Sequence, residues 1–279
     1  MSDEASPLFE QRPQNLVVTL LGAYVYPDDR LVWSGGLVRL LGELGFSPGA
    51  ARVALARLTR RDLLARVRDG RRVHYRVTPR ATALLREGER RIFTLGRDDR
   101  PAGEWTILSH AVPDERRRER GRLARRLRFL GFGSLQDGVW ISPHDRAAEV
   151  ASLLEELDLV GHAAVVLGRP AGPTDLEALV ARAWDVDGLA RRYRAFELAF
   201  GRHAKRAEGS GLADRDAFLV RTRLAHTFRQ FPSLDPGLPD EVVPTNGHRA
   251  RAVALFHDLY AALAGPAGRH FAGATAPPG

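Results

Sequence analysis

Arginine is the residue type whose number and placement in this chain could do chemistry. All but one of the 42 Lys and Arg residues are Arg, the exception being Lys205. Residues 52–80 contain ten Arg against two acids, Asp62 and Asp69, so this window carries +8, which equals the formal net charge of the whole chain. A guanidinium group can hold phosphate oxygens or bridge guanine O6 and N7. A compositional bias would scatter arginines, so this local excess indicates a nucleic-acid contact.

The first arginines of this window fall on a helix predicted over residues 47–61. Ser47 is a good N-cap, and Pro48 suits the first helical position. At about 100° per residue, an apolar stripe is formed by Ala51, Leu55 and Leu58. The opposite face consists of Gly49, Val53, Ala56 and Arg60, with Arg52 and Arg57 at its flanks. Small outward residues framed by arginines would let this helix enter the major groove deeply.

Two further helices are predicted before it. Apolar residues recur at helical spacing from Leu16 to Tyr24. Ser34 can cap the second helix, and Gly45 is placed to end it. The segment therefore supplies three helices before residue 62.

Alternation of apolar residues with arginines predicts a β-hairpin over residues 65–77. Asp69-Gly70 is a two-residue type I′ turn signal at its centre. One face of the hairpin is expected to be apolar, comprising Ala65, Val67, Val73, Tyr75 and Val77. The other face would project into solvent Arg66, Arg68, Arg72, His74 and Arg76. The hairpin would thus be a basic wing.

Three helices followed by a basic hairpin are typical of a winged helix-turn-helix domain, which we place at residues 15–80. The helix over residues 47–61 would enter the major groove, and the wing would hold phosphates. Contacts to double-stranded DNA are predicted for Arg52, Val53, Arg57, Arg60, Arg68, Arg71 and Arg72. The alternative is that these arginines form only a solvated face of an arginine-rich protein.

The remainder of the chain predicts two further domains, which makes it an α+β multidomain protein. Residues 81–102 are charged and favour helix, as a connector would. Residues 103–174 then show strand, helix, two strands, helix and strand, the order of a ferredoxin-like βαββαβ domain. Residues 175–270 predict an α-helical C-terminal domain that includes a polar loop over residues 201–213. Small residues over 264–279 predict a fraying tail.

Composition excludes several classes of protein. At 44% hydrophobic and 27% charged residues, the 279-residue chain is typical of a folded protein. The lack of cysteine excludes disulfides, thiolate metal sites and cysteine nucleophiles. The sequence shows no signal-peptide pattern and no apolar run long enough for a bilayer, so a cytoplasmic protein without a membrane partner is expected. No metal site is predicted, because the histidines lack the spacing of metal ligands. No catalytic motif and no cofactor-binding motif stands out, so no cofactor is predicted either.

Several segments resemble the PaaX family of bacterial repressors. In the N-terminal part these segments are Leu21-Gly22-Ala23-Tyr24-Val25, the run from Trp33 to Leu41, and the run from Ala51 to Leu58. Further along they are Phe129-Leu130-Gly131-Phe132-Gly133, Gly138-Val139-Trp140-Ile141-Ser142-Pro143, Ala183-Trp184-Asp185-Val186, the run from Arg221 to Arg229, Asp235-Pro236-Gly237-Leu238-Pro239, and Leu259-Tyr260. The resemblance covers roughly residues 15–270, with its motifs in the right order.

The resemblance implies a ligand-responsive transcriptional repressor of an aromatic-acid operon of the phenylacetate type. The implied effector is an aryl-acyl coenzyme A, notably phenylacetyl-CoA, and the residues that would bind it are Trp184, Arg221 and Arg223. The sequence departs from the family pattern at Asp62, where Gly is usual, and at Gly49, where a larger polar residue is common. It departs again after Pro244, where a Trp is common.

A second hypothesis follows from the central segment. The middle domain of the family is similar to small CRISPR-associated nucleases of ferredoxin-like fold, in which a metal-binding Asp follows the first strand. Here Asp114 is the candidate, with His110 beside it. One Asp and one His do not make a two-metal site, so the protein is not expected to be an enzyme. A nucleic-acid-processing enzyme, a metal-dependent nuclease, is the alternative.

A homodimer is expected on general grounds. One helix and wing contact only a short half-site, and two copies about a two-fold axis would read an inverted repeat. The apolar stripes after residue 175 exceed what one short helical hairpin can bury, so part of the dimer contact is predicted there.

Overall fold

The computed structural model describes residues 12–28, 30–96, 104–208 and 211–277. The contacts between residues divide the chain into two compact units. Unit 1 is drawn from Met1–Phe93, Ala195–Arg229 and Ala254–Gly279, and unit 2 from Thr94–Arg194 and Gln230–Val253. The C-terminal helices are therefore shared between the two units. Residues 97–103, in the predicted connector and at the start of the next domain, lie outside the described residues.

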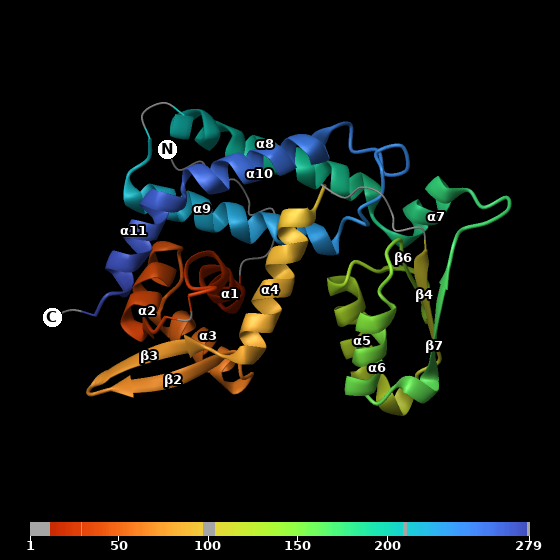
Figure 1. Cartoon of the computed structure of the whole chain (residues 1–279), viewed down its shortest axis with the longest axis horizontal. Coiled ribbons are helices and arrows are strands. Elements are labelled where there is room, and N and C mark those ends of the chain that lie inside the picture. Colours follow the sequence, from red (N-terminus) through yellow and green to blue (C-terminus); the bar gives the residue numbers. More distant parts are fainter. Residues whose placement is uncertain (1–11, 29, 97–103, 209–210, 278–279) are drawn as a thin grey trace. The chain divides into compact units, whose positions relative to one another are not determined.

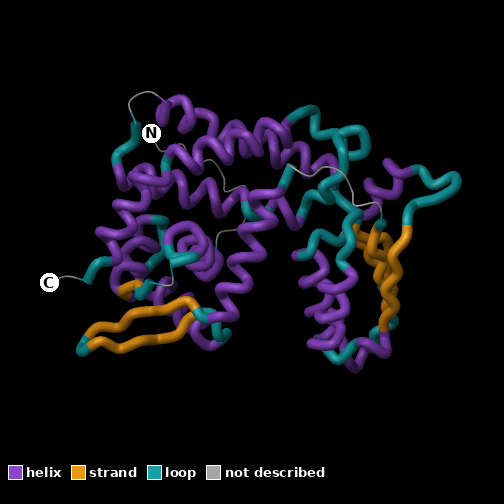
Figure 2. The backbone as a smooth tube through the Cα atoms, in the orientation of Figure 1, coloured by secondary structure: helices purple, strands orange, loops and turns teal. Residues whose placement is uncertain are grey.

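The N-terminal part of unit 1 packs three helices beside a small antiparallel sheet (Figures 1 and 2). Its elements are α1 (Pro13–Tyr24), β1 (Val32–Trp33), α2 (Ser34–Glu43), α3 (Pro48–Arg60), β2 (Leu64–Asp69), β3 (Arg72–Val77) and α4 (Pro79–Thr94). The sheet order is β1-β3-β2. The core between the helices is aliphatic, and its fully buried residues include Leu16, Leu20, Leu37, Leu41 and Leu55.

The start of α2 differs from the prediction. Ser34 is the first residue of the helix, Trp33 is the N-cap, and no side chain caps the helix there. Val32 and Trp33 form the short strand β1, which pairs with Tyr75 and His74. Gly45 ends the helix as predicted, with a φ of 98° and the Phe46 N–H bonded to the Leu41 carbonyl.

The register of the hairpin also differs from the prediction. Asp69 pairs with Arg72, so the two turn residues are Gly70 and Arg71. Gly70 has positive φ and Arg71 does not, a pattern of the type II′ turn and not of type I′. Because side chains alternate between faces, the shift by one residue redistributes them. Val67 now shares a face with His74, and Arg68 with Val73.

The prediction that the arginines of the hairpin all share one face is therefore wrong. Arg66 and Arg68 lie on one face, whereas Arg76 lies on the other. His74, expected in solvent, is only 8% exposed. The arginines reach solvent because the hairpin extends beyond the helices, so that both of its faces are open toward the turn (Figure 1).

The C-terminal helices complete unit 1. They are the second half of α8 (Val186–Glu208), α9 (Asp214–Phe228), the second half of α10 (His248–Ala262), and α11 (Ala264–Thr275). Helix α11 packs against α9 and α2, and α9 packs against α1. A Cβ atom on Gly36 of α2 would lie 2.4 Å from the Ala274 carbonyl oxygen, so this glycine permits the close approach of α11.

Two segments of the C-terminal part differ from what the sequence predicts. The fraying tail is helix α11 over most of its length, because Phe271 is fully buried and stacks on Tyr24 at 4.8 Å. The loop predicted from residue 201 begins only after Glu208, because α8 continues to that residue. Over the described residues, no helix is long and apolar enough to cross a membrane.

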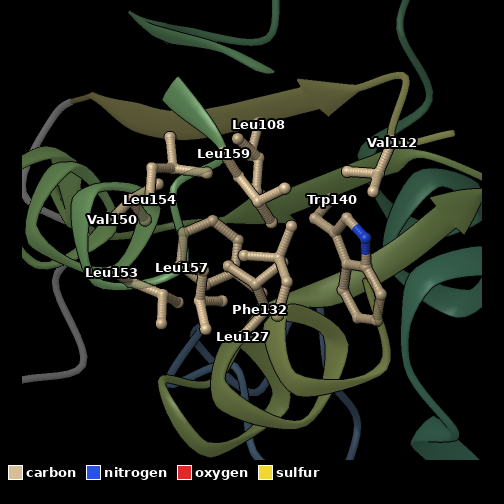
Figure 3. Close-up of a cluster of buried hydrophobic side chains, with 11 residues drawn as sticks. Leu108, Val112, Leu127, Phe132, Trp140, Val150, Leu153, Leu154, Leu157 and Leu159 are labelled. Atoms are coloured by element: carbon tan, nitrogen blue, oxygen red, sulfur yellow. The ribbon is translucent and has the colours of Figure 1, made fainter. Parts of the chain in front are cut away.

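Unit 2 contains the predicted βαββαβ arrangement. Its elements are β4 (Trp105–His110), η1 (Asp114–Arg116), α5 (Arg117–Phe129), β5 (Gly133–Gln136), β6 (Val139–Ser142), α6 (Ala147–Glu156), η2 (Val160–His162) and β7 (Ala163–Gly168). The antiparallel sheet has the order β5-β6-β4-β7. Figure 3 shows the core between sheet and helices, in which Leu108, Leu127, Phe132 and Trp140 meet the leucines of α6.

Two further segments of unit 2 follow the sheet. They are α7 (Leu176–Ala183) with the first half of α8, and the segment from η3 (Phe231–Ser233) to the start of α10. A buried polar cluster joins them: the Tyr193 hydroxyl donates to Asp235 Oδ2 at 2.6 Å, and Arg249 Nε lies 2.9 Å from the same oxygen.

Candidate nucleic-acid interface

Helix α3 presents the predicted residues on a single exposed face. Ala51, Ala54, Leu55 and Leu58 are buried against the other helices. The opposite side is exposed and consists of Arg52, Val53, Ala56, Arg57 and Arg60. Val53 is 49% exposed, which is unusual for a large apolar side chain and leaves it free for an apolar contact such as a thymine methyl group.

Local hydrogen bonds fix both ends of α3. The Ser47 side chain accepts from the Ala50 N–H at 3.2 Å, and Pro48 is the first helical residue, as predicted. At the other end, the Leu63 N–H bonds to the Leu58 carbonyl and the Asp62 N–H to the Thr59 carbonyl, which is a Schellman motif.

The Schellman motif imposes an unfavourable backbone conformation on a residue that is not glycine. Asp62 occupies the position that demands a left-handed backbone, and its φ is 54°. Glycine adopts this conformation without a Cβ penalty, whereas aspartate does so at a cost. The Thr78 hydroxyl donates to the Asp62 carbonyl at 2.7 Å and ties this turn to the start of α4.

The wing places further arginines beyond α3. Arg68, Arg71 and Arg72 are exposed around the Gly70 turn, as the sequence indicated. Arg61 and Arg66 are exposed on the same elements but were not among the predicted contacts. The signal that could have found Arg66 is its spacing of two from Arg68, because residues i and i+2 of a strand share a face.

The arginines of this surface are available for phosphate or base contacts. Within the described part of the chain, the side chains of Arg52, Arg57, Arg60, Arg68 and Arg71 form no hydrogen bond and no ion pair. An exposed guanidinium group without a counter-ion attracts anions, and because it is more weakly hydrated than an ammonium group it pairs readily with phosphate. These five side chains can therefore bind polyanions without first breaking internal ion pairs.

The three residues expected to bind an effector lie in different surroundings. Arg221 is buried in unit 1, where Nε donates to the Tyr260 carbonyl and Nη1 to the Ala23 carbonyl, both at 3.1 Å. Arg223 is exposed, two residues further along the same helix. Trp184 is 8% exposed and belongs to unit 2. The buried position of Arg221 could not be read from the sequence, since the neighbouring Arg223 has the same type and a different environment.

The two residues considered for a nuclease site have other partners. Asp114 is exposed and forms an ion pair with Arg120 at 3.0 Å. His110 Nε2 accepts from the Trp140 indole N–H at 3.3 Å, and burial lowers the pKa of this imidazole. Across the described ranges, no group of three or more His, Asp or Glu side chains is placed to hold a metal ion.

Comparisons with known proteins cover the chain in three parts. Residues 12–81 match the model of PaaX-like proteins, residues 98–180 match the PaaX protein central Cas2-like domain, and residues 184–273 match the PaaX-like protein C-terminal domain. The transcriptional repressor PaaX of Escherichia coli is 28% identical over 254 residues, which span 86% of this chain and 78% of that protein. A solved structure, the uncharacterized protein Rv0674 from Mycobacterium tuberculosis, matches with a TM-score of 0.55 at 23% identity over 95% of this chain and 99% of that one. This last likeness concerns the fold.

Proposed function

The chain belongs to the PaaX family, and on that premise we propose that it is a DNA-binding transcriptional repressor. The observation that carries the proposal is the exposed face of α3, on which Arg52, Arg57 and Arg60 have no internal partner among the described residues. The name of the Escherichia coli relative, a transcriptional repressor, supports the same function. The alternative of a metal-dependent nuclease has no comparable support from the described side chains.

We propose that α1 to α3 and the β2–β3 hairpin act as a winged helix-turn-helix. Helix α3 would lie in the major groove with Arg52 and Arg57 at base edges, Val53 at an apolar contact and Arg60 at phosphate. Arg68, Arg71 and Arg72 of the wing would contact the backbone. In this arrangement the helix supplies sequence preference, and the wing supplies affinity that depends on salt.

The domain layout proposed from the sequence is 15–80 for DNA binding, 81–102 for the connector, 103–174 for the ferredoxin-like domain and 175–270 for the helical domain. The family models divide the chain in a similar way. In the structure, α9 packs directly on α1, and α11 packs directly on α2. A shift of α9 or α11 would therefore change the packing of α1 and α2, which belong to the same compact unit.

We further propose that an aryl-acyl-CoA, phenylacetyl-CoA or a close analogue, lowers the affinity for the operator of a phenylacetate-type operon. Of the three residues expected to bind the effector, Arg221 already donates to two backbone carbonyls. Trp184 in unit 2 and Arg223 in unit 1 are separate candidates, each within its own unit. Repression would be relieved because the ligand binds the DNA-free state more tightly, since a ligand with equal affinity for both states shifts nothing.

The active species is proposed to be a homodimer on an inverted repeat. A single helix and wing cover too few base pairs for a unique address in a genome, and two-fold symmetry doubles the site. Sedimentation velocity at micromolar concentration, together with a footprint of two half-sites, tests this. A monomer protecting one half-site would contradict it.

The function itself is tested by gel shift with DNA from upstream of the gene and its neighbours. One duplex should shift at nanomolar protein in the presence of excess competitor DNA, and it should remain intact after incubation with Mg²⁺ or Mn²⁺. A degraded duplex would favour the nuclease. Equal binding to all duplexes would show that the protein does not select an operator.

A further inference from the structure

Helix α5 of unit 2 concentrates positive charge that the DNA-binding module does not account for. Its 13 residues include seven arginines and one acid, Glu119. Helix α6, which packs beside it (Figure 1), has three glutamates and no basic residue. A bias of composition toward arginine would enrich both helices. The contrast between the two neighbours therefore indicates that the arginines of α5 have a function of their own.

The arginines of α5 lie on the side of the helix that faces solvent. Leu123 and Leu127 are fully buried in the core of unit 2 and fix the opposite side. At about 100° per residue, a stripe on the outer side is formed by Arg118, Arg122 and Arg125. These three are exposed, as are their neighbours Arg117, Arg126 and Arg128. We call the surface made by these six residues the outer face of α5.

Most of this charge has no counter-ion. Arg122 forms an ion pair with Glu156 at 3.4 Å, and Arg120, beside the outer face, forms one with Asp114 at 3.0 Å. Within the described ranges, the other five arginines of the helix form no hydrogen bond and no ion pair; they are Arg117, Arg118, Arg125, Arg126 and Arg128. The outer face can therefore bind anions without first losing internal ion pairs at these five positions.

The placement of the arginines is unfavourable for α5 by itself. Arg122 has an arginine four residues before it and another four residues after it, and like charges at this spacing repel one another. Arg117 and Arg118 are the first two residues of the helix, where the helix dipole disfavours cations. A helix that needed only to be soluble would be more stable with glutamate at some of these positions. Binding of an array of anions would relieve the repulsion, so the placement favours a polyanion as the partner.

Duplex DNA fits this surface better than a second copy of the chain presenting α6. Glu149 of α6 is paired with Arg146 and Glu156 with Arg122, so among the described residues of α6 only Glu155 is an acid without an ion pair. From Arg117 to Arg128 the helix rises about 16 Å, and a duplex carries about ten phosphate charges over that length. DNA therefore supplies continuous negative charge where α6 supplies one free carboxylate.

We propose that the outer face of α5 is a second DNA-contacting surface, which binds phosphates of the duplex outside the base pairs that α3 and the wing contact. Phosphate contacts carry no sequence information, so this surface raises the affinity for DNA without changing the preference for an operator. The inference rests on the proposed function, because it takes the same duplex as the partner, and it adds a contact from unit 2.

Binding isotherms of the full chain at several salt concentrations test the proposal. The α5 variant replaces three exposed arginines that have no ion pair, by Arg118→Gln, Arg125→Gln and Arg126→Gln. On a duplex that extends well beyond the operator on both sides, the slope of log affinity against log salt concentration should fall by about three, one for each lost phosphate contact. A wild-type slope in this variant would overturn the proposal.

A matched control separates the position of the charges from their number. It removes the same charge from exposed arginines of unit 2 outside α5, by Arg169→Gln, Arg182→Gln and Arg194→Gln. Its slope should fall by less than one on the same duplex. An equal fall in the control and in the α5 variant would show that net charge matters and α5 does not.

A trimmed duplex locates the contact. It contains only the base pairs that the α5 variant protects in a hydroxyl-radical footprint, so the flanking phosphates are absent. Wild type and α5 variant should bind this short duplex with equal affinity. If the wild type still binds it more tightly, α5 contacts the same base pairs as α3 and the wing, and the assignment to flanking DNA is wrong.

Measurements without DNA exclude a structural or subunit role. The melting temperature of the α5 variant should equal or exceed that of the wild type, because the substitutions remove repulsion between like charges. Sedimentation velocity should show the same assembly state for both proteins. A lower melting temperature would mean that the arginines stabilise the fold, and a change in assembly state would mean that the outer face joins two copies of the chain; either result would overturn the proposal.

Duplexes without an operator separate this proposal from the proposed function. Because phosphate contacts do not depend on sequence, the α5 variant should show the same fall in slope on an unrelated duplex of equal length. That fall, together with no preference of the wild type for any duplex, would leave the α5 surface standing and refute the repressor. Selection of an operator with a wild-type slope in the α5 variant would refute the surface and leave the repressor.

Discussion

The Arg221 guanidinium lies 3.7 Å above the centre of the Tyr260 ring and donates from Nε to the carbonyl of the same residue at 3.1 Å. Its Nη1 donates to the carbonyl of Ala23 near the end of α1, and the Tyr24 ring lies 5.1 Å from the guanidinium carbon. One side chain of α9 thus joins α10 to the first helix of the proposed DNA-binding module. The C-terminal helices are part of the body that presents α3, and not a separate attachment.

Replacing Arg221 should therefore destabilise the protein. Arg221→Met leaves two partly buried carbonyl oxygens without their donor and removes two ring contacts, so the free energy of unfolding should fall by about 3 kcal/mol. Thermal denaturation measures the change. Arg223→Met, an exposed arginine of the same helix, is the matched control and should melt like the wild type. If both variants melt alike, Arg221 has no structural role.

Arg52 and Arg57 should carry the sequence preference of the DNA contact. Each bidentate contact between arginine and guanine contributes roughly 1–3 kcal/mol of discrimination, so Arg52→Ala and Arg57→Ala should each weaken operator binding about tenfold or more. Their melting temperatures should not change, because both side chains are exposed. Fluorescence anisotropy with operator DNA is the measurement, and Arg194→Ala, exposed on α8, is the control. Full affinity in both α3 variants would show that another surface reads the DNA.

The wing arginines should act through phosphate. Loss of each phosphate contact lowers the slope of log affinity against log salt concentration by about one unit. The double variant Arg71→Ala, Arg72→Ala should therefore show a slope smaller by about two, while its preference for the operator over other sequences is retained. Binding isotherms at several salt concentrations measure this. A wild-type slope in the double variant would place the wing away from the backbone.

Asp62→Gly should stabilise the protein. The left-handed conformation costs an L-residue roughly 1–2 kcal/mol, and glycine avoids most of this cost but loses more chain entropy. A net gain of about 1 kcal/mol would raise the melting temperature by about 2–4 °C. Operator affinity should be unchanged. Asp69→Gly, at a wing residue whose φ is not positive, serves as control and should bring no gain. Equal melting of Asp62→Gly and the wild type would show that the strain is relieved in another way.

Stability should decline at mildly acidic pH because of His226. Burial and the nearby Arg229 lower the pKa of this imidazole from 6.5 to about 4, and Nδ1 lies 3.0 Å from the Thr19 hydroxyl. Since the unfolded chain binds the proton more readily, the contribution is complete above about pH 6.5 and is lost as the pH falls toward 4. It amounts to about 3 kcal/mol.

Chemical denaturation of wild type and His226→Gln between pH 7.5 and about pH 4 measures this contribution. The glutamine variant keeps a polar group near Thr19 but does not titrate, so its stability should depend less on pH in this range. Parallel pH profiles for the two proteins would mean that other groups cause the acid loss.

Features that depend on neighbours in the sequence were predictable. Ser47 and Pro48 begin α3 and Gly45 ends α2, because caps are made by residues within one turn of the helix end. The order of elements in the ferredoxin-like domain followed from periodicity, and the sheet order agrees with it. The exposed face of α3 followed from the positions of its apolar residues, since burial of one stripe leaves the opposite stripe in solvent.

Features that depend on distant parts of the chain were decided only by the tertiary structure. The hairpin register moved by one residue, and His74 was buried as a result, because pairing is set by packing as well as by the turn signal. The small residues of α11 resemble a frayed tail in the sequence. In the fold, the same smallness lets its backbone lie against Gly36 while Phe271 enters the core. Arg221 and Arg223 are chemically identical, and only their long-range surroundings make one a buried donor and the other an exposed cation.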